Sequence, residues 1–174
     1  MEFKKICVMG LGYIGLPTAS TFAANGAEVV GVDIKRDIIN TINQGGIHIH
    51  EPGLLEMVQT ALSTGRLKVQ MTAEEADAFI ISVPTPFNDD KSADLRAVRS
   101  ATKAIMPFLR KGNLVILEST SPPQTTEQVV APILEESGLK AGDDFLLCYS
   151  PERVLPGRIL IELKENALVM CGVT

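Results

Sequence analysis

Three glycines spaced as Gly-x-Gly-x-x-Gly lie directly after the first apolar segment of this 174-residue chain. Residues 4–9 form a short apolar run that predicts a buried strand, and residues 14–25 predict a helix. Gly10, Gly12 and Gly15 therefore occupy the turn between a strand and a helix, where a dinucleotide-binding loop must lie. Gly10 permits the tight turn, Gly12 lets the backbone approach a pyrophosphate, and Gly15 lets the helix pack closely on the sheet.

An acidic residue completes this pattern at the end of the second predicted strand, residues 28–32. Asp33 follows Gly15 by 18 residues, and a carboxylate there accepts hydrogen bonds from the adenosine ribose hydroxyls and repels a 2′-phosphate. The pattern favours NAD over NADP, although Lys35 and Arg36 are nearby cations that weaken the preference. The alternative interpretation is an ordinary strand–turn–helix corner in which Asp33 caps the next helix.

The rest of the chain repeats the alternation of strand and helix. Apolar runs predict strands at residues 67–70, 78–83, 114–117, 145–149 and 167–171, and the segments between predict helices at 35–43, 53–62, 95–109 and 125–136. Strands that are almost continuously apolar are typical of a parallel sheet covered on both faces. We therefore expect an α/β fold, a doubly wound, Rossmann-like parallel sheet with helices on both faces.

Composition narrows the class of partner. Apolar residues make up 45% of the chain and charged residues 21%, which is typical of a globular domain. The formal net charge of −5 gives no electrostatic footprint for nucleic acid or for an anionic membrane. Glycines interrupt the apolar stretch that follows Lys4 and Lys5, and no stretch reaches 18 apolar residues, so we expect a cytoplasmic chain without a membrane partner.

Three cysteines, Cys7, Cys148 and Cys171, each lie in an apolar stretch, and no two have Cys-x-x-Cys spacing. This arrangement indicates neither a zinc site nor a redox pair, and it predicts three buried, reduced side chains. His48 and His50 precede a glutamate, but we expect no metal site from this short pattern.

Side chains at the ends of the predicted strands are candidates for cofactor contacts, because ligands of open α/β sheets bind at the carboxyl ends of strands. Tyr13 and Ile14 lie between the glycines, where their N–H groups face a phosphate. Thr85 and Thr120 end two strands, and Thr126 begins a helix. The alternative for each threonine is a helix cap or a turn residue.

Six sequence segments together resemble those of a known enzyme family. GLGYIGLPTA, VGVDI, HEPGL, SVPTPF, ILESTSPP and YSPERVLPGR occur in this order, and together they resemble the nucleotide-sugar 6-dehydrogenases, the group of UDP-glucose and GDP-mannose dehydrogenases. The last segment is most similar to the branch that acts on UDP-N-acetylhexosamines, and within it to the UDP-N-acetyl-D-mannosamine dehydrogenases. The resemblance covers nearly the whole chain.

The resemblance implies a two-step oxidation of the sugar C6 hydroxyl to a carboxylate, with two NAD reduced. Family members hold the aldehyde on a Cys nucleophile, assisted by a Lys and an Asn, and these groups lie beyond residue 174. Residues 1–174 are then an N-terminal NAD-binding domain that ends before a central helix and a C-terminal UDP-sugar-binding domain, and the full-length protein is expected to form a homo-oligomer, a dimer. The alternatives are UDP-N-acetylglucosamine, UDP-glucose or GDP-mannose as the substrate, and a non-catalytic NAD-binding module.

Some family residues match positions here. Glu152 matches a glutamate that activates water during thioester hydrolysis, and Thr120 matches the threonine that positions this water beside the nicotinamide. Arg153 and Val154 match residues that contact the sugar nucleotide. The alternatives are a structural glutamate in a turn and, for Arg153, a surface ion pair.

The family's NAD contacts match Tyr13, Ile14, Asp33, Thr85 and Thr126. One position departs from the pattern, because Gln124 stands in SPPQTT where the family usually has glycine. This departure puts the contact of Thr126 in doubt.

None of the three cysteines fits the family's nucleophile, because a competent thiolate needs an accessible, electropositive setting. We therefore expect this chain to bind NAD without turning over a UDP-sugar by itself.

Overall fold

The structure, a computed structural model, describes residues 3–173. Within these residues one sheet has the strand order β3-β2-β1-β4-β5-β6-β7. The strands are β1 (Lys5–Met9), β2 (Glu28–Val32), β3 (Leu67–Gln70), β4 (Ala78–Ile81), β5 (Leu114–Leu117), β6 (Leu146–Tyr149) and β7 (Cys171–Gly172). All neighbours from β3 to β6 pair in parallel, as the apolar strands predict.

The last strand differs from the prediction. β7 runs antiparallel to β6 and contributes only two residues, so the expected strand at residues 167–171 is wrong in extent. Residues 167–170 lie at the edge of the sheet without pairing, and Leu168 is 71% exposed. Apolar composition indicates a strand only where both sides of the segment can be covered.

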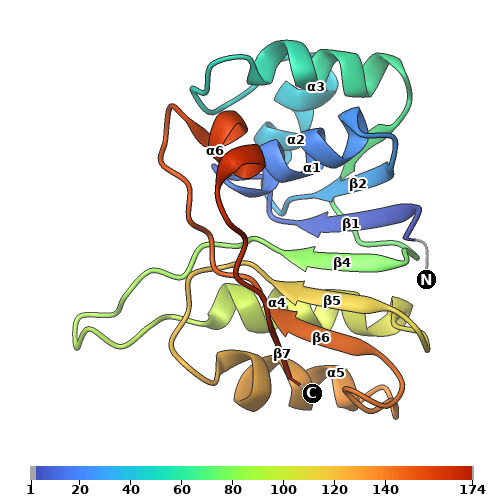
Figure 1. Cartoon of the computed structure of the whole chain (residues 1–174), viewed down its shortest axis with the longest axis vertical. Coiled ribbons are helices and arrows are strands. Elements are labelled where there is room, and N and C mark those ends of the chain that lie inside the picture. Colours follow the sequence, from blue (N-terminus) through green and yellow to red (C-terminus); the bar gives the residue numbers. More distant parts are fainter. Residues whose placement is uncertain (1–2, 174) are drawn as a thin grey trace.

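Helices connect the strands and cover both faces of the sheet. They are α1 (Gly15–Ala24), α2 (Arg36–Asn43), α3 (Leu54–Ser63), α4 (Arg96–Ile105), α5 (Ala131–Glu135) and α6 (Ile159–Glu165), with a 3₁₀ turn η1 (Met106–Phe108) and a π-helical turn η2 (Thr126–Val130). Figure 1 shows α1, α2 and α3 beside β1 and β2, whereas α4 and α5 lie beside β5 and β6. Helix α6 was not predicted from the sequence.

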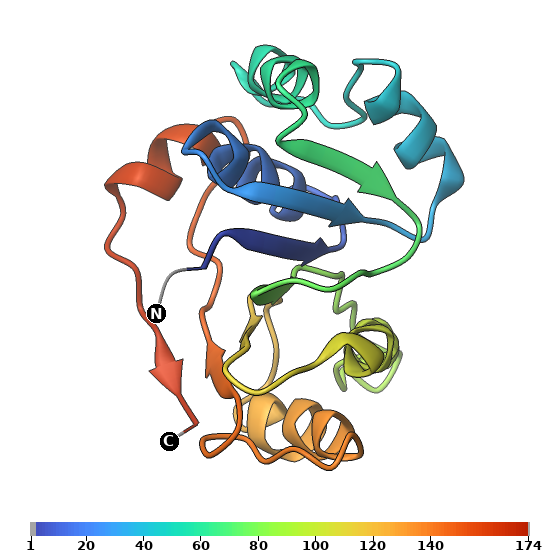
Figure 2. The same cartoon turned by 90° about the vertical axis from the view of Figure 1, so that its right-hand side faces the viewer.

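Two faces of each strand feed two separate cores. Cys7 and Met9 of β1 belong to a core with α4 and α5, whereas Ile6 and Val8 belong to a core with α1, α2 and α3. Successive side chains of a strand point to opposite faces, which is why one apolar run supplies both cores. Figure 2 shows α4 and α6 on opposite sides of the sheet, and the prediction of helices on both faces is confirmed.

Two predicted helices change their geometry at prolines. Residues 95–109 form α4 and then the 3₁₀ turn η1, which contains Pro107. Residues 125–136 begin as the π-helical turn η2, and α5 begins just before Pro132. A proline has no N–H to donate, and its ring crowds the preceding turn, so the regular helical ladder changes there.

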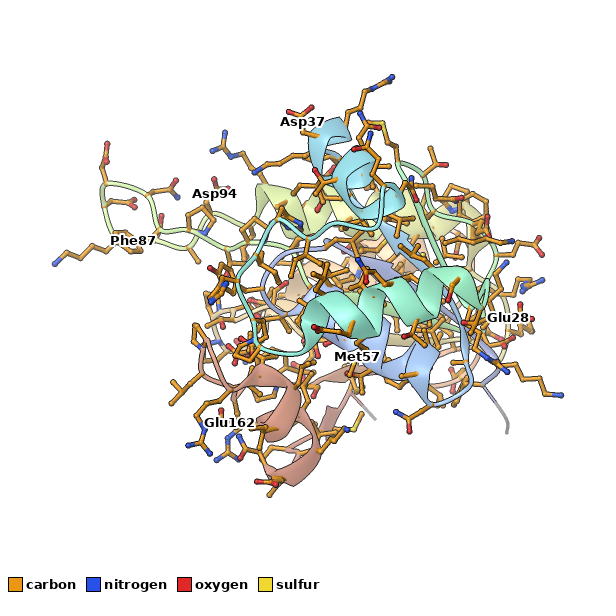
Figure 3. The ribbon with its side chains drawn as sticks, turned by 90° about the horizontal axis from the view of Figure 1, so that it is seen from above. Glu28, Asp37, Met57, Phe87, Asp94 and Glu162 are labelled. Atoms are coloured by element: carbon orange, nitrogen blue, oxygen red, sulfur yellow. The ribbon has the colours of Figure 1, made fainter. Side chains whose placement is uncertain are left out.

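The carboxyl ends of the strands form one edge of the sheet, toward which the arrowheads in Figure 1 point. The chain leaves β1 toward β2 and β3 and returns to add β4 on the other side, so the strand order reverses between β1 and β4. Ligands of such sheets bind in the crevice outside this reversal. The long loop after β4, which carries Phe87 and Asp94, projects from this edge, far from Glu28 (Figure 3).

The described residues include no helix that is long and apolar enough to span a lipid bilayer.

Candidate functional site

The glycine loop between β1 and α1 tolerates no side chain at two of its positions. Gly10 has a φ of +94°, and its N–H donates to the Val32 carbonyl at 2.7 Å. A Cβ atom on Gly10 would lie 2.4 Å from the Ser82 carbonyl oxygen, and a Cβ atom on Gly15 would lie 1.8 Å from the Gly10 carbonyl oxygen. Gly10 and Gly15 are therefore required for the loop to pack between β1, β4 and α1.

Gly12 is different, because a Cβ atom there would meet nothing within 4 Å. The protein does not need this glycine for its own packing, so the space beside its backbone is free for a ligand. Tyr13 and Ile14 follow directly, and α1 begins at Gly15 with no acidic residue in its first turn. The N-terminus of a ten-residue helix favours an anion, and the loop fits a pyrophosphate.

Asp33 lies at one side of this loop. Its Oδ2 atom accepts a hydrogen bond from the Leu11 N–H at 3.0 Å, and its Oδ1 atom accepts one from the Lys35 N–H at 2.9 Å. Each carboxylate oxygen retains capacity for a ribose hydroxyl. A mostly apolar cavity of about 420 Å³ opens beside Asp33, between Met9, Val83 and α4. The cavity and the carboxylate together fit an adenosine.

A second pocket of about 350 Å³ lies at the β4 side of the loop. Its lining includes Tyr13, Ile14, Thr85 and Thr120, which the structure thus brings together. The Thr85 hydroxyl donates to the Thr120 carbonyl, which joins the ends of the segments that follow β4 and β5. Both pockets adjoin the glycine loop, the first at Gly10 and the second at Tyr13 and Ile14, and Val83 and Pro84 border both.

Glu118 also lines this second pocket, and the sequence analysis did not single it out. Its carboxyl group accepts a hydrogen bond from the Ser82 hydroxyl. Burial raises the pKa of Glu118, the bond from Ser82 lowers it, and the charge of Glu152 raises it further. The only sequence signal was a glutamate directly after a buried strand, in the segment ILEST.

Thr126 lies apart from the other predicted cofactor residues. It is the first residue of η2, is 7% exposed, and faces a smaller pocket of about 140 Å³ that Gln124 and Cys171 also line. Gln124 has a φ of +67°, a conformation that glycine adopts at little cost and other residues rarely adopt. The structure does not bring Thr126 into the pocket of Thr85 and Thr120.

Glu152, Arg153 and Val154 lie in the loop between β6 and α6. The carboxylate of Glu152 accepts from the Val154 N–H within the loop. The Arg153 guanidinium donates to the Ala167 carbonyl at 3.5 Å, and the Asn166 side chain donates to the Arg153 carbonyl at 2.8 Å. These contacts place Arg153 on the segment after α6, whereas Glu152 lies near enough to Glu118 to act on its charge.

Glu51 holds the far end of that loop, and the sequence analysis gave it no such role. It is 5% exposed, and its two oxygens accept hydrogen bonds from the N–H groups of Gly157 and Ile159, both at 2.7 Å. Ile159 is fully buried, and Leu160 packs on the core formed with α1 and α3. Glu51 therefore fixes the loop of Glu152 and Arg153 to the segment that precedes α3.

His48 belongs to the same segment and lies near Asp33 and the Leu11 carbonyl. Partial burial lowers the pKa of His48 below its ordinary value of 6.5, although the charge of Asp33 opposes this shift. An uncharged imidazole therefore adjoins Asp33 at neutral pH.

The cysteines divide into two buried and one exposed. Burial raises the pKa of the Cys7 thiol to about 11 and also raises that of Cys148. Neither supplies a thiolate near neutral pH. Cys171 is exposed, so its predicted burial is wrong, because β7 lies at the edge of the sheet with one side uncovered.

A cavity larger than either of these pockets lies at the opposite edge of the sheet. It has about 580 Å³ and is lined by Phe22, Arg66 and the amino ends of β1, β4 and β5. Parallel strands of this topology present their ligand sites at the carboxyl ends, so volume alone does not locate the site.

Comparisons with known proteins agree with this geometry. Residues 4–174 match the sequence model of the NAD-binding domain of the UDP-glucose/GDP-mannose dehydrogenase family. The chain is 51% identical over 176 residues to a UDP-N-acetyl-D-mannosamine dehydrogenase of Methanococcus maripaludis, covering 99% of this chain and 39% of that protein. It is 47% identical over 181 residues to an NDP-N-acetyl-D-galactosaminuronic acid dehydrogenase of Ralstonia solanacearum, covering 100% of this chain and 43% of that protein.

A solved structure shows the same fold. The native UDP-N-acetyl-mannosamine dehydrogenase of Staphylococcus aureus superposes with a TM-score of 0.94 at 50% identity, covering 98% of this chain and 42% of that one. The chain thus spans about two fifths of the length of the relatives it matches.

Proposed function

This chain belongs to the UDP-glucose/GDP-mannose dehydrogenase family, and we propose that it is the cofactor-binding part of an enzyme that oxidises UDP-N-acetyl-D-mannosamine to UDP-N-acetyl-D-mannosaminuronate. The observation that carries the cofactor is the pair of pockets that adjoin the glycine loop, one beside Gly10 and Asp33 and the other beside Thr85 and Thr120. The observation that favours this sugar is the 51% identity to a dehydrogenase of that name.

The cofactor residues have separate tasks. Gly10 and Gly15 shape the loop, the backbone at Gly12, Tyr13 and Ile14 takes the pyrophosphate, and Asp33 takes the adenosine ribose. Thr85 and Thr120 border the pocket for the other half of NAD. NAD, when bound, supplies the acceptor for the hydride that leaves C6 of the sugar. We retain Thr126 as a cofactor contact only for a conformation in which the turn around Gln124 moves.

The proposed substrate residues lie on one loop. Glu152 holds the proton of the hydrolytic water, Thr120 orients that water, and Arg153 and Val154 contact the sugar nucleotide. A guanidinium is a natural partner for a diphosphate, and Arg153 reaches one only by leaving the Ala167 carbonyl. The nucleophilic Cys, its Lys and its Asn belong to a further domain, and the assembled enzyme is a homodimer of the cytoplasm, where free cysteines stay reduced.

A nucleotide of N-acetyl-D-galactosamine or its uronic acid is a second candidate substrate, supported by one of the comparisons. A relative named for an N-acetyl-D-galactosaminuronic acid nucleotide is 47% identical, close to the values for the mannosamine enzymes. UDP-N-acetylglucosamine, UDP-glucose and GDP-mannose remain further candidates, and a non-catalytic NAD-binding module is the alternative outside enzymology.

Two experiments test the proposal. The first is to read the gene beyond codon 174: a frame that continues into a Gly-rich segment with a Cys and an upstream Lys supports the enzyme, and an immediate stop codon supports the module. The second is to assay the full-length product with NAD and each sugar nucleotide. The highest kcat/KM is expected for UDP-N-acetyl-D-mannosamine, and a higher value for another sugar contradicts the assignment.

The chain alone provides a control. We expect no steady formation of NADH from residues 1–174 with NAD and UDP-N-acetyl-D-mannosamine, because Cys7 and Cys148 are buried with raised thiol pKa values. Cys171 is exposed, but it lines the pocket of Gln124 and Thr126 and not the pocket of Thr85 and Thr120. Steady NADH production by the purified chain would contradict the need for a further domain.

A further inference from the structure

Glu118 is an acidic side chain for which the proposed function has no use. It lines the pocket of about 350 Å³ together with Tyr13 and Ile14, whereas Asp33 lines the other pocket at the glycine loop. If Asp33 receives the adenosine half of NAD, the nicotinamide half falls on this side of the glycine loop. The inference below therefore rests on the proposed binding of NAD.

One hydrogen bond holds the carboxyl group of Glu118, and others hold the chain segment that carries it. The Ser82 hydroxyl at the end of β4 donates to its Oε2 atom, and the neighbouring Ser119 hydroxyl accepts from the Val83 N–H at 2.9 Å. Ser119 is buried, and it also donates to the Ile81 carbonyl at 3.2 Å. The segment after β5 is thus tied to the segment after β4, so Glu118 cannot swing freely into water.

The surroundings of Glu118 disfavour a negative charge. Burial is the largest cause, whereas the side chains of Ser82 and of the buried Thr18 of α1 act in the opposite direction and lower the pKa of Glu118. Glu152, from the loop after β6, is the charged group that acts on Glu118, and it is acidic too. Tyr13, from the glycine loop, is the other titratable group of the pocket. Desolvation and the like charge of Glu152 both raise the pKa of Glu118.

We propose that Glu118 makes the preference of this pocket for oxidised over reduced nicotinamide depend on pH. The oxidised ring carries a positive charge and the reduced ring is neutral, while the rest of the dinucleotide is the same in both. A protonated Glu118 has no charge and does not distinguish the two rings electrostatically, whereas an ionised Glu118 attracts only the positively charged oxidised ring.

Linkage between protonation and binding fixes the direction in which pH changes the preference for NAD over NADH. The raised pKa keeps the proton on Glu118 above pH 4.5, and the proton leaves as the pH rises further. Binding of NAD then becomes tighter relative to binding of NADH, and NAD releases a proton from Glu118 when it binds. A neutral Glu118 holds the oxidised form less tightly, which leaves the bound nicotinamide a better hydride acceptor.

The test is calorimetric titration of the 174-residue chain with NAD and with NADH between pH 5 and pH 9. The ratio of the NADH dissociation constant to that of NAD should rise about tenfold across the titration of Glu118, which corresponds to a shift of one pKa unit by an opposite charge within about 4–6 Å. Glu118→Gln should remove this pH dependence. Glu152→Gln should keep it and move it to lower pH, because one like charge is gone. Glu56→Gln, on the exposed face of α3, is the matched control and should behave like the wild type.

An NMR titration of the Glu118 carboxyl group in the wild type tests the inference even if Glu118→Gln fails to fold. Carbon-13 NMR of the glutamate side chains should show an apparent pKa for Glu118 that falls when NAD binds and stays unchanged when NADH binds. A ratio that is independent of pH in the wild type, or equally dependent in Glu118→Gln, would overturn the inference. Absence of binding by either nucleotide would instead refute the proposed function, and the inference with it.

Discussion

At the scale of single residues, Gly12 and Gly15 differ in whether the packing of the protein leaves room for a side chain. A methyl group on Gly15 would overlap the Gly10 carbonyl, whereas a methyl group on Gly12 would point into open space. Both glycines belong to one short loop, and both were predicted from the same spacing. Only the structure shows that the packing of the protein requires Gly15 and does not require Gly12.

Substituting each glycine by alanine should therefore have opposite consequences. Gly12→Ala should leave the melting temperature within a few degrees of the wild type and abolish measurable NAD binding, because its Cβ atom enters the space for the pyrophosphate. Gly15→Ala should lower the free energy of unfolding by about 1–3 kcal/mol or more, the usual cost of overpacking. Thermal unfolding and NADH fluorescence measure the two effects. An equal loss of stability in both variants would contradict the division of roles.

In the proposed function, Asp33 sets the choice of dinucleotide. Asp33→Ala should weaken NAD binding by roughly 1–3 kcal/mol, the scale of a lost hydrogen bond to a charged group, and should narrow the difference from NADP. Asp37→Ala, an exposed acidic residue in the first turn of α2, removes the same charge without touching the cavity and serves as the control. Isothermal titration calorimetry measures both affinities, and an unchanged NAD affinity in Asp33→Ala would contradict the assigned role.

At the scale of elements, Glu51 shows what a linear sequence conceals. Its partners Gly157 and Ile159 are more than 100 residues away, so no local pattern pairs them. Helix α6 was missed for a related reason, because ILIEL is apolar on successive positions and has no helical period. The strands β2, β3 and β5 were predicted with their observed bounds, since a continuous apolar run bounded by turns is a local signal.

Removing the charge of Glu51 should loosen the loop of Glu152 and Arg153 before it unfolds the domain. An amide has one acceptor oxygen, so Glu51→Gln leaves either the buried N–H group of Ile159 or the partly buried N–H group of Gly157 without a partner, and the loss of the buried one costs about 1–3 kcal/mol. Amide hydrogen exchange at Gly157 and Ile159 should accelerate, whereas exchange in β1 and β4 should not. Glu56→Gln is again the control. Uniformly faster exchange across the sheet would show that Glu51 supports the whole fold instead.

Gln124, in the turn before η2, has a backbone conformation that residues with a Cβ atom rarely adopt. Gln124 adopts a positive φ, although its side chain accepts a hydrogen bond from the Gln128 side chain at 2.9 Å. The left-handed conformation costs a residue with a Cβ atom about 1 kcal/mol, so the family's preference for glycine here has a physical reason.

Substituting Gln124 by glycine and by alanine isolates the free-energy cost of the left-handed backbone conformation. Both Gln124→Gly and Gln124→Ala remove the contact with Gln128, but only glycine relieves the backbone. Gln124→Gly should therefore exceed Gln124→Ala in unfolding free energy by about 1 kcal/mol. Urea denaturation of the two variants measures the difference, and equal stabilities would mean that the turn relaxes out of the left-handed region.

At the scale of the whole molecule, the sheet has cavities at both ends of its strands, and the proposed site for NAD lies at the carboxyl ends. The strand order and the reversal between β1 and β4 follow from the alternation of strands and helices, and this part of the architecture was predictable. The placement of Glu118, Glu152 and Thr126 relative to the pockets was not, because it depends on how three separate loops pack at one edge. The larger cavity at the amino ends of the strands would have misled a search by volume.

The most direct test of the account is an amide NMR titration of the 174-residue chain with NAD. The account predicts saturable shifts at residues 10–15, at Asp33, and at residues 82–85 and 118–120, with Phe22, Asn25 and Arg66 unaffected. Shifts confined to Phe22, Asn25, Arg66 and the amino ends of the strands, or none at the glycine loop, would contradict it.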